Sequence, residues 1–160
     1  MKKLLGMILT LALAAGLAWP VYAESSTVPP EVTAHAYLVM DAQTGQVLVQ
    51  KGGAERNYPA SITKIMTLAL AMEKCGGDMT QQVTVSPDAV YSLEAGSSHV
   101  ALQPGEVVSL NDLFHATILA SANDAASVIA SDVSDGDLTA FVARMNQRAK
   151  ELGCTSTSFT

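Results

Sequence analysis

Residues 59–74 of this 160-residue chain read PASITKIMTLALAMEK, and this stretch decides how the rest of the sequence is interpreted. A proline near its start and the glycine pair at 76–77 predict a helix with these ends, because proline suits a first helical turn and glycine favours a helix terminus. Apolar residues from Ile62 to Met72 fall on every face of that helix. Such a helix is typical of a domain interior, so we expect it to be buried.

Ser61 and Lys64 within this stretch are a candidate nucleophile and its base. Residues three apart on a helix share a face, with Cβ atoms about 5–6 Å apart. A serine hydroxyl is a good nucleophile only when a base takes its proton. Lysine can be that base if burial lowers its pKa well below about 10.4, and the apolar neighbours of Lys64 predict such burial. Free N–H groups and the helix dipole in the first turn would favour an oxyanion at Ser61.

The pair Ser-x-x-Lys is by itself a weak signal, because short motifs often arise by chance. Lys64 could extend its amine to solvent along the protein surface, and Ser61 could be an ordinary helix cap. The surrounding sequence has to decide between these interpretations.

A second polar motif, Ser121-Ala122-Asn123, interrupts the apolar spacing of two predicted helices. Side chains in such a break can face a cleft, whereas the alternative is that they only cap the following helix, for which Asp124 is the expected N-cap. Ser109-Leu110-Asn111 has the same spelling. Ser109 opens a helix and has an acidic residue three positions later, so we interpret it as a cap.

The remaining elements follow from turn residues and periodicity. Two apolar runs at 36–40 and 46–50 flank the turn cluster 41–45 and predict a β-hairpin. A short strand is expected at 82–85, followed by a turn at Ser86-Pro87. Further helices are expected after Ser109 and at 125–130.

A last amphipathic helix is expected between the break at 135–137 and Gly153. Its apolar face should consist of residues at helical spacing: Phe141, Met145, Ala149 and Leu152.

The N-terminus has the features of a signal peptide. Lys2 and Lys3 precede an uncharged apolar run at 4–18, and Val21-Tyr22-Ala23 has the small-x-small form of a cleavage site. The run is short for a membrane span of about 20 residues, so an uncleaved anchor is the less favoured alternative. We expect a signal peptide at 1–23, a polar linker with two prolines at 24–33, and a folded domain at 34–160.

The composition argues against several other classes. A formal net charge of −6 without basic clusters disfavours binding to nucleic acid or to an anionic membrane. Cys75 and Cys154 are too few for a disulfide framework, and we expect them to remain unpaired. No Cys-x-x-Cys occurs and the three histidines lie far apart in sequence, so neither a metal site nor a cofactor is expected.

Residues 59–67, PASITKIMT, resemble the nucleophile helix of serine-type D-alanyl-D-alanine carboxypeptidases among the low-molecular-mass penicillin-binding proteins. The segment SANDAA at 121–126 is similar to the second motif of that family and its continuation. Shorter stretches at 40–45, 102–106 and 145–153 fit as well. The resemblance extends from about Ala34 to Phe159.

This resemblance implies a β-lactamase/transpeptidase-like α/β sandwich with an all-helical subdomain. It also implies residue roles. Ser61 would attack the penultimate D-alanine carbonyl and form an acyl-ester, and Lys64 would accept its proton. Ser121 would relay protons near the leaving group, and Asn123 would bind the substrate backbone and help hold Lys64. The backbone N–H of Ser61 would form half of an oxyanion hole.

The implied partners are peptidoglycan stem peptides ending in D-Ala-D-Ala as substrates and β-lactams as covalent inhibitors, with no cofactor. The implied location is the bacterial cell envelope, reached through the signal peptide. Any membrane anchoring would depend on a segment after residue 160.

The sequence departs from the family pattern at its third motif, Lys-Thr-Gly, because none of the six lysines is followed by Thr-Gly or Ser-Gly. We therefore interpret the chain as truncated before the later sheet strands, which would leave an exposed edge on the hairpin. We expect residues 1–160 alone to release negligible D-alanine from a D-Ala-D-Ala peptide.

Two other functions remain open. One is a β-lactamase built on the same catalytic groups, although alanine at the middle of Ser121-Ala122-Asn123 looks more like the carboxypeptidases. The other is a non-catalytic exported binding module in which these residues serve only packing.

Overall fold

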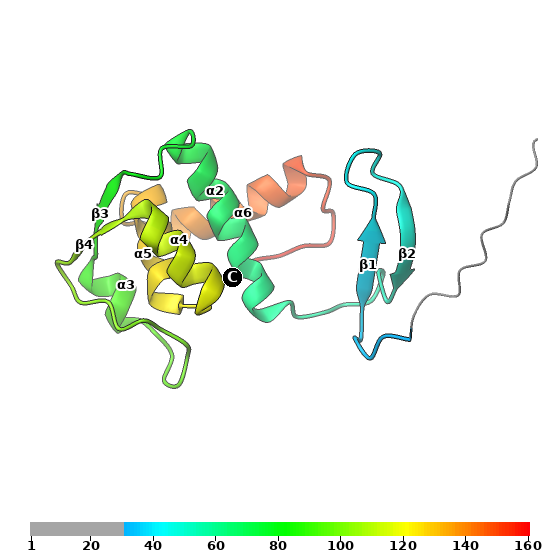
Figure 1. The fold of residues 1–160 in the computed structure, drawn as a ribbon, viewed down its shortest axis with the longest axis horizontal. Helices are drawn as coiled ribbons and strands as arrows, with labels where there is room; N and C mark the ends of the chain where they lie inside the picture. The colour runs from blue at the N-terminus through cyan, green and yellow to red at the C-terminus, as the bar shows by residue number, and fades with distance from the viewer. Residues whose placement is uncertain (1–30) are drawn as a thin grey trace, which may run out of the picture. The chain divides into compact units, whose positions relative to one another are not determined.

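A computed structural model describes residues 31–160 in two compact units that meet in sequence at Asn57 and Tyr58 (Figure 1). The predicted signal peptide at 1–23 lies outside the described residues, as does most of the predicted linker. Over the range 31–160, no helix is both long enough and apolar enough to cross a bilayer.

The first unit contains the predicted hairpin, formed by β1 (Tyr37–Met40) and β2 (Val47–Lys51) in antiparallel register. Its turn is fixed by Asp41, whose carboxylate accepts the backbone N–H of Thr44 at 2.7 Å and the Thr44 hydroxyl at 2.8 Å. These two bonds lower the pKa of Asp41, the backbone bond more strongly. Gly45 closes the turn at φ +73°, a conformation that glycine adopts without strain.

Side chains of the hairpin remain largely in solvent, including Leu38 at 52% and Leu48 at 62% exposure. Among the described residues, no side chain of β1 or β2 is buried. The hairpin is therefore specified by its turn and backbone ladder rather than by a core.

The second unit is mainly helical. Its elements in chain order are η1 (Ala60–Thr63), α2 (Lys64–Cys75), β3 (Gln82–Thr84), α3 (Pro87–Tyr91), β4 (Val107–Ser109), α4 (Leu110–Leu119), α5 (Asn123–Val133) and α6 (Leu138–Glu151). Strands β3 and β4 pair antiparallel, with Val83 opposite Val108.

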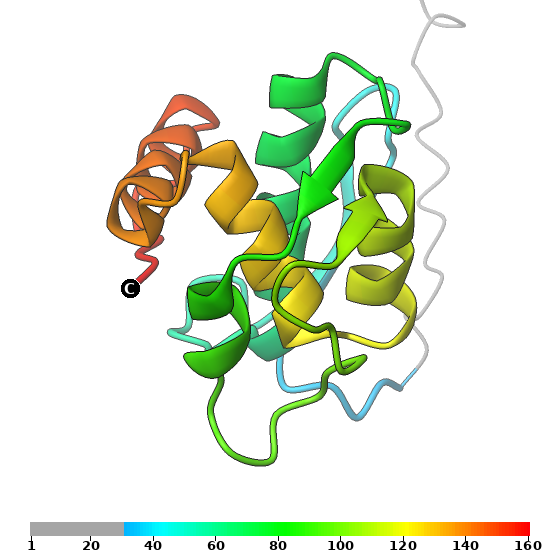
Figure 2. The same ribbon diagram turned by 90° about the vertical axis from the view of Figure 1, so that its left-hand side faces the viewer.

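Helix α5 lies at the centre of this unit and contacts α2, α3, α4 and α6 (Figure 2). Its residues Ala125, Val128 and Ile129 are at most 1% exposed and pack with Leu113 of α4 in the main core cluster. A second cluster is formed at α6 by Leu70, Ala130, Phe141 and Met145. The central helix thus packs against α2, α4 and α6 and joins them in one unit.

The expectation that α2 is buried on every side is wrong. Lys64, Leu68 and Ala71 are buried, whereas Ile62 and Ile65 are 65% and 61% exposed. The other helices of the unit cover only one face of α2, and that face carries the lysine.

Two smaller expectations are also corrected. Ser86 and Pro87 do not make a simple turn but begin α3, with Ser86 accepting the Ala89 N–H at 3.3 Å and Pro87 in the first helical position. Leu152 is 59% exposed because it follows the end of α6, whereas Phe141, Met145 and Ala149 are buried as predicted.

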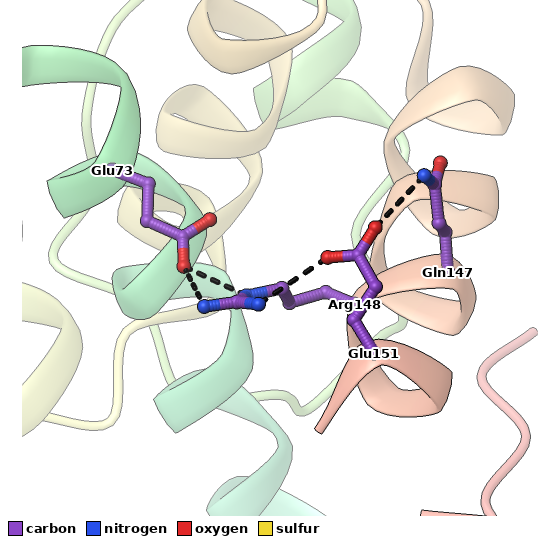
Figure 3. A network of polar contacts seen from close by, with 4 residues as sticks. All are labelled: Glu73, Gln147, Arg148 and Glu151. Atoms are coloured by element: carbon purple, nitrogen blue, oxygen red, sulfur yellow. Dashed lines mark hydrogen bonds and ion pairs between the residues drawn. The ribbon is translucent and has the colours of Figure 1, made fainter. Parts of the chain in front are cut away.

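Polar side chains join α2 to α6 (Figure 3). Arg148 of α6 donates from Nε and Nη2 to Glu73 of α2 at 2.8 and 2.7 Å, and from Nη1 to Glu151 at 3.2 Å. Gln147 donates to the other oxygen of Glu151 at 2.9 Å. These side chains are partly exposed, so each ion pair contributes about 0–1 kcal/mol to the stability of the fold.

The two cysteines, Cys75 and Cys154, are free, as expected.

Candidate active site

Ser61 lies in a short 3-10 turn rather than in the first turn of a continuous α-helix. This turn, η1, runs from Ala60 to Thr63, and the α-helix begins at Lys64. Ala60, directly before the serine, has φ +50°, a left-handed conformation that is uncommon for alanine. The predicted helix therefore exists, but its first turn is wound more tightly and the serine follows a strained residue.

Three polar atoms from two separate stretches of chain come together here. Ser121 Oγ donates to Ser61 Oγ at 2.8 Å. Lys64 Nζ lies 3.4 Å from both hydroxyl oxygens and donates to each. Ser61 and Lys64 are three residues apart, whereas Ser121 comes from the connection between α4 and α5. The structure thus brings together three of the four residues that the sequence singled out.

Lys64 is only 9% exposed, and no carboxylate of the described residues forms an ion pair with it. Loss of solvent disfavours the charged ammonium, and this desolvation lowers the pKa of Lys64. The predicted burial of Lys64 and the predicted lowering of its pKa are therefore confirmed.

Ser121 owes its position to the tight connection between α4 and α5. Its φ of +52° is left-handed, and Ala122 is fully buried with its N–H bonded to the Ala116 carbonyl at 3.2 Å. A non-glycine residue in this region costs about 1–3 kcal/mol and persists only where its surroundings hold it. The strained backbone turns the hydroxyl toward Ser61 instead of toward the next helix.

Asn123 is the first residue of α5, and its backbone N–H donates to the Ser98 carbonyl at 2.8 Å. Its side chain makes no hydrogen bond to Lys64 within the described residues, where that amine bonds only the two serine hydroxyls. The expected hydrogen bond from Asn123 to the lysine is therefore not formed, although the residue directly follows the Ser121 turn.

The expectation that Asp124 is the N-cap of α5 is wrong. The cap position is Ala122, which has no capping side chain, and Asp124 lies two residues further on. Its carboxylate is 1% exposed and accepts backbone N–H groups of Val100 and Leu102. Sequence reasoning missed this role because the partners are backbone groups in a loop without periodicity. The one available signal was a carboxylate directly before an apolar helix.

Chemically, the cluster can support covalent catalysis. Ser61 offers an oxygen that could act as a nucleophile, Lys64 an amine whose pKa is lowered by desolvation, and Ser121 a hydroxyl placed to pass a proton. Within residues 31–160, no group of three or more His, Cys, Asp or Glu side chains could hold a metal ion.

The sequence of the chain was compared with known protein families. Residues 23–160 match the family described as D-alanyl-D-alanine carboxypeptidase, Peptidase S11. The chain belongs to this family. The resemblance found in the sequence is thereby confirmed.

One relative of the chain is the D-alanyl-D-alanine carboxypeptidase DacC of Escherichia coli K12. It is 38% identical to this chain over 86% of this chain and 36% of the relative. DacF of Bacillus subtilis 168 is 33% identical over 99% of this chain and 41% of the relative. The crystal structure of penicillin binding protein 6B from Escherichia coli matches with a TM-score of 0.74 and 33% identity, covering 86% of this chain and 45% of that one.

These matches confirm the predicted fold class. The chain has the α/β fold of the penicillin-binding and transpeptidase structures, here as helices with two small sheets. It spans about two fifths of the length of the curated relatives named above.

Proposed function

We propose that the protein containing this chain is a serine D-alanyl-D-alanine carboxypeptidase that removes the terminal D-alanine from peptidoglycan stem peptides. The observation that carries the proposal is the cluster of Ser61, Lys64 and Ser121, with its buried, desolvated amine, in a chain of this family.

Acylation would begin at Ser61. Its oxygen attacks the carbonyl carbon of the penultimate D-alanine while its proton passes to the neutral amine of Lys64. The carbonyl becomes a tetrahedral oxyanion, and the backbone N–H of Ser61 is one donor for it. The peptide C–N bond then breaks, and a proton delivered through Ser121 leaves with the D-alanine amine. Asn123 would bind the substrate backbone.

Deacylation would use the same groups in reverse. A water molecule attacks the acyl-ester, gives its proton to the amine of Lys64, and the Ser61 hydroxyl is restored as the shortened peptide leaves. A penicillin acylates the same oxygen when its β-lactam C–N bond opens, and the ring nitrogen then remains attached to the acyl group.

The proposed organisation of the chain is a signal peptide at 1–23, a linker at 24–33 and part of the catalytic domain at 34–160. Export through this signal would deliver the enzyme to the bacterial cell envelope, where its substrate is found. The N-terminal residue of protein purified from that compartment should then be Glu24, which mass spectrometry can determine.

Labelling with a fluorescent penicillin tests the function. The protein expressed from the whole reading frame should form a covalent adduct that survives denaturation, and the variant Ser61→Ala should form none. The matched control is Ser109→Ala, which removes a hydroxyl from the same unit and should leave labelling unchanged. Absence of an adduct on wild-type protein would overturn the proposal and favour a non-catalytic binding module.

The lifetime of the penicillin adduct distinguishes a carboxypeptidase from a β-lactamase. A carboxypeptidase should hold the penicilloyl group through many minutes and release D-alanine from a D-Ala-D-Ala peptide. Rapid turnover of the penicillin without D-alanine release would instead assign a β-lactamase.

A further inference from the structure

We propose that Asp124 is a positioning residue for acylation: its buried carboxylate anchors the loop at 92–106 to the first turn of α5 and so holds Ser121 and Asn123 in place. This inference rests on the proposed function, because it assigns Asp124 a role in the reaction of Ser61.

Two of the three backbone N–H groups that bond the carboxylate belong to the loop. Its two oxygens lie 3.2 and 3.1 Å from the Val100 nitrogen, and Oδ2 also accepts the Leu102 N–H at 3.0 Å. Oδ1 accepts the N–H of the next residue, Ala125, at 2.9 Å. In all of these contacts the side-chain oxygens act as acceptors of backbone N–H groups.

No cation accompanies this buried group. In the described part of the chain, Asp124 is 1% exposed and forms no ion pair with a lysine, arginine or histidine. A buried carboxylate is costly unless hydrogen bonds replace its water. The backbone N–H groups of the loop therefore have to stay in place, and carboxylate and loop constrain each other.

The loop needs such an anchor because it has no helix or strand of its own between Ser92 and Glu106. It also bends through Ala101, whose φ is +61°. A second tie is adjacent to the first, since the Asn123 N–H donates to the Ser98 carbonyl at 2.8 Å. Two consecutive residues of α5 thus hold the loop, one through its backbone and one through its side chain.

These ties act on the residues of the proposed reaction. Asn123 directly precedes Asp124, and the left-handed Ser121 lies only three residues before it. With Ala122 bonded to Ala116 on the other side, the turn that carries the Ser121 hydroxyl is held from both directions. A shift of about 1 Å in a catalytic group can reduce a rate about 100-fold.

The test is Asp124→Asn in the protein expressed from the whole reading frame. Asparagine keeps the shape but turns one acceptor oxygen into a donor that faces a backbone N–H. We expect the limiting rate of penicillin acylation to fall about 10- to 100-fold, with a smaller change in the half-saturating concentration. Asp124→Ala, which removes the carboxylate without introducing a donor, should give a similar loss and serves as the second variant if the asparagine variant does not fold.

The matched controls are Asp137→Asn and Asp137→Ala. Asp137 also accepts a helical N–H, that of Ala140 at 2.9 Å, but it caps α6, and within residues 31–160 it forms no hydrogen bond with the loop at 92–106. Loss of this cap should lower stability and leave the acylation rate unchanged. A drop in rate with Asp124 variants alone, measured well below the unfolding temperature, therefore reports positioning and not stability.

Hydrogen exchange provides a readout that needs no variant. The amides of Val100 and Leu102 should exchange more slowly in wild-type protein than that of Ala101, which donates to the exposed His99 ring. Equal rates would overturn the anchor, as would a folded Asp124 variant that is acylated at the wild-type rate. Wild-type protein that takes no penicillin at all would instead overturn the proposed function, and the role of Asp124 with it.

Discussion

The two ends of helix α4 carry the same three-residue pattern, Ser-x-Asn, with different results. At the N-terminal end, Ser109 has an extended backbone with φ −68° and its hydroxyl accepts the Asp112 N–H at 3.1 Å. At the C-terminal end, Ser121 has φ +52° and its hydroxyl bonds Ser61 and Lys64. One hydroxyl completes its own helix, whereas the other is directed to a distant segment.

The difference teaches that backbone conformation, more than residue type, determines what a serine does. An extended residue before a helix directs its hydroxyl at the free N–H groups of the first turn. The left-handed residue after a helix cannot do this, so its hydroxyl is available to other groups. The comparison can be tested by making the same changes at both ends.

The largest effect is expected for the Ser121→Ala variant. Loss of the relaying hydroxyl should reduce the rate of penicillin acylation about 100-fold or more, a typical contribution of a positioned proton-transfer group. Stopped-flow labelling measures this rate. If Ser121→Ala is acylated as fast as wild type, the two ends of α4 are functionally alike and the proposed relay is wrong.

The pH dependence should be the next largest effect. Desolvation lowers the pKa of Lys64, and only the neutral amine accepts the Ser61 proton. The acylation rate should therefore rise about tenfold per pH unit below that pKa and level off above it, at a pH below the ordinary lysine value of about 10.4. Ser109→Ala should show the same profile in a pH series. A midpoint at or above 10.4 would contradict the role of the buried amine.

At the other end of α4, Ser109→Ala should lower the free energy of unfolding by about 1 kcal/mol through loss of the cap. The acylation rate of the folded protein should not change. Urea unfolding of both alanine variants measures the contrast. A loss of acylation in Ser109→Ala under native conditions would show that the two ends are coupled.

The smallest effect is expected for glycine substitutions, which should change the free energy of unfolding in opposite directions at Ser121 and Ser109. Ser121→Gly relieves a left-handed residue and should raise the free energy of unfolding by a few tenths to about 1 kcal/mol. Ser109→Gly should lower it by a few tenths of a kcal/mol. Thermal unfolding of the two variants gives both signs, and a stabilised Ser109→Gly would contradict the assigned backbone roles.

Much of the fold followed from local patterns in the sequence. The hairpin, the helix after Ser61, the cap at Ser109 and the buried face of α6 were predicted correctly because each depends on neighbours within a few residues. Exposure of Ile62 and Ile65 was missed. Periodicity identifies an apolar helix, but it cannot tell which of its faces the other elements cover.

Only part of the candidate site was predictable from local pattern. Ser61 and Lys64 share a turn, so their proximity follows from helical spacing. Ser121 was selected from the polar break before α5 together with the resemblance of residues 121–126 to the family's second motif, because its contact with Ser61 joins residues 60 positions apart. Asp124 was misassigned as a cap because its partners, Val100 and Leu102, are more than twenty residues away in an aperiodic loop. A cap such as Ser109 bonds a backbone group within its own turn and can be recognised from residue types, whereas bonds to the backbone of a distant loop cannot.

The left-handed backbone at Ser121 also limits which hydroxyl residue can stand there during evolution. Threonine carries the same hydroxyl and differs from serine by one methyl group, yet a β-branched residue at positive φ is a genuine outlier. At Ser109 that exchange would preserve a good cap. In a mutational scan, threonine should therefore be tolerated at Ser109 and not at Ser121. The same conservative substitution is then acceptable before α4 and harmful after it.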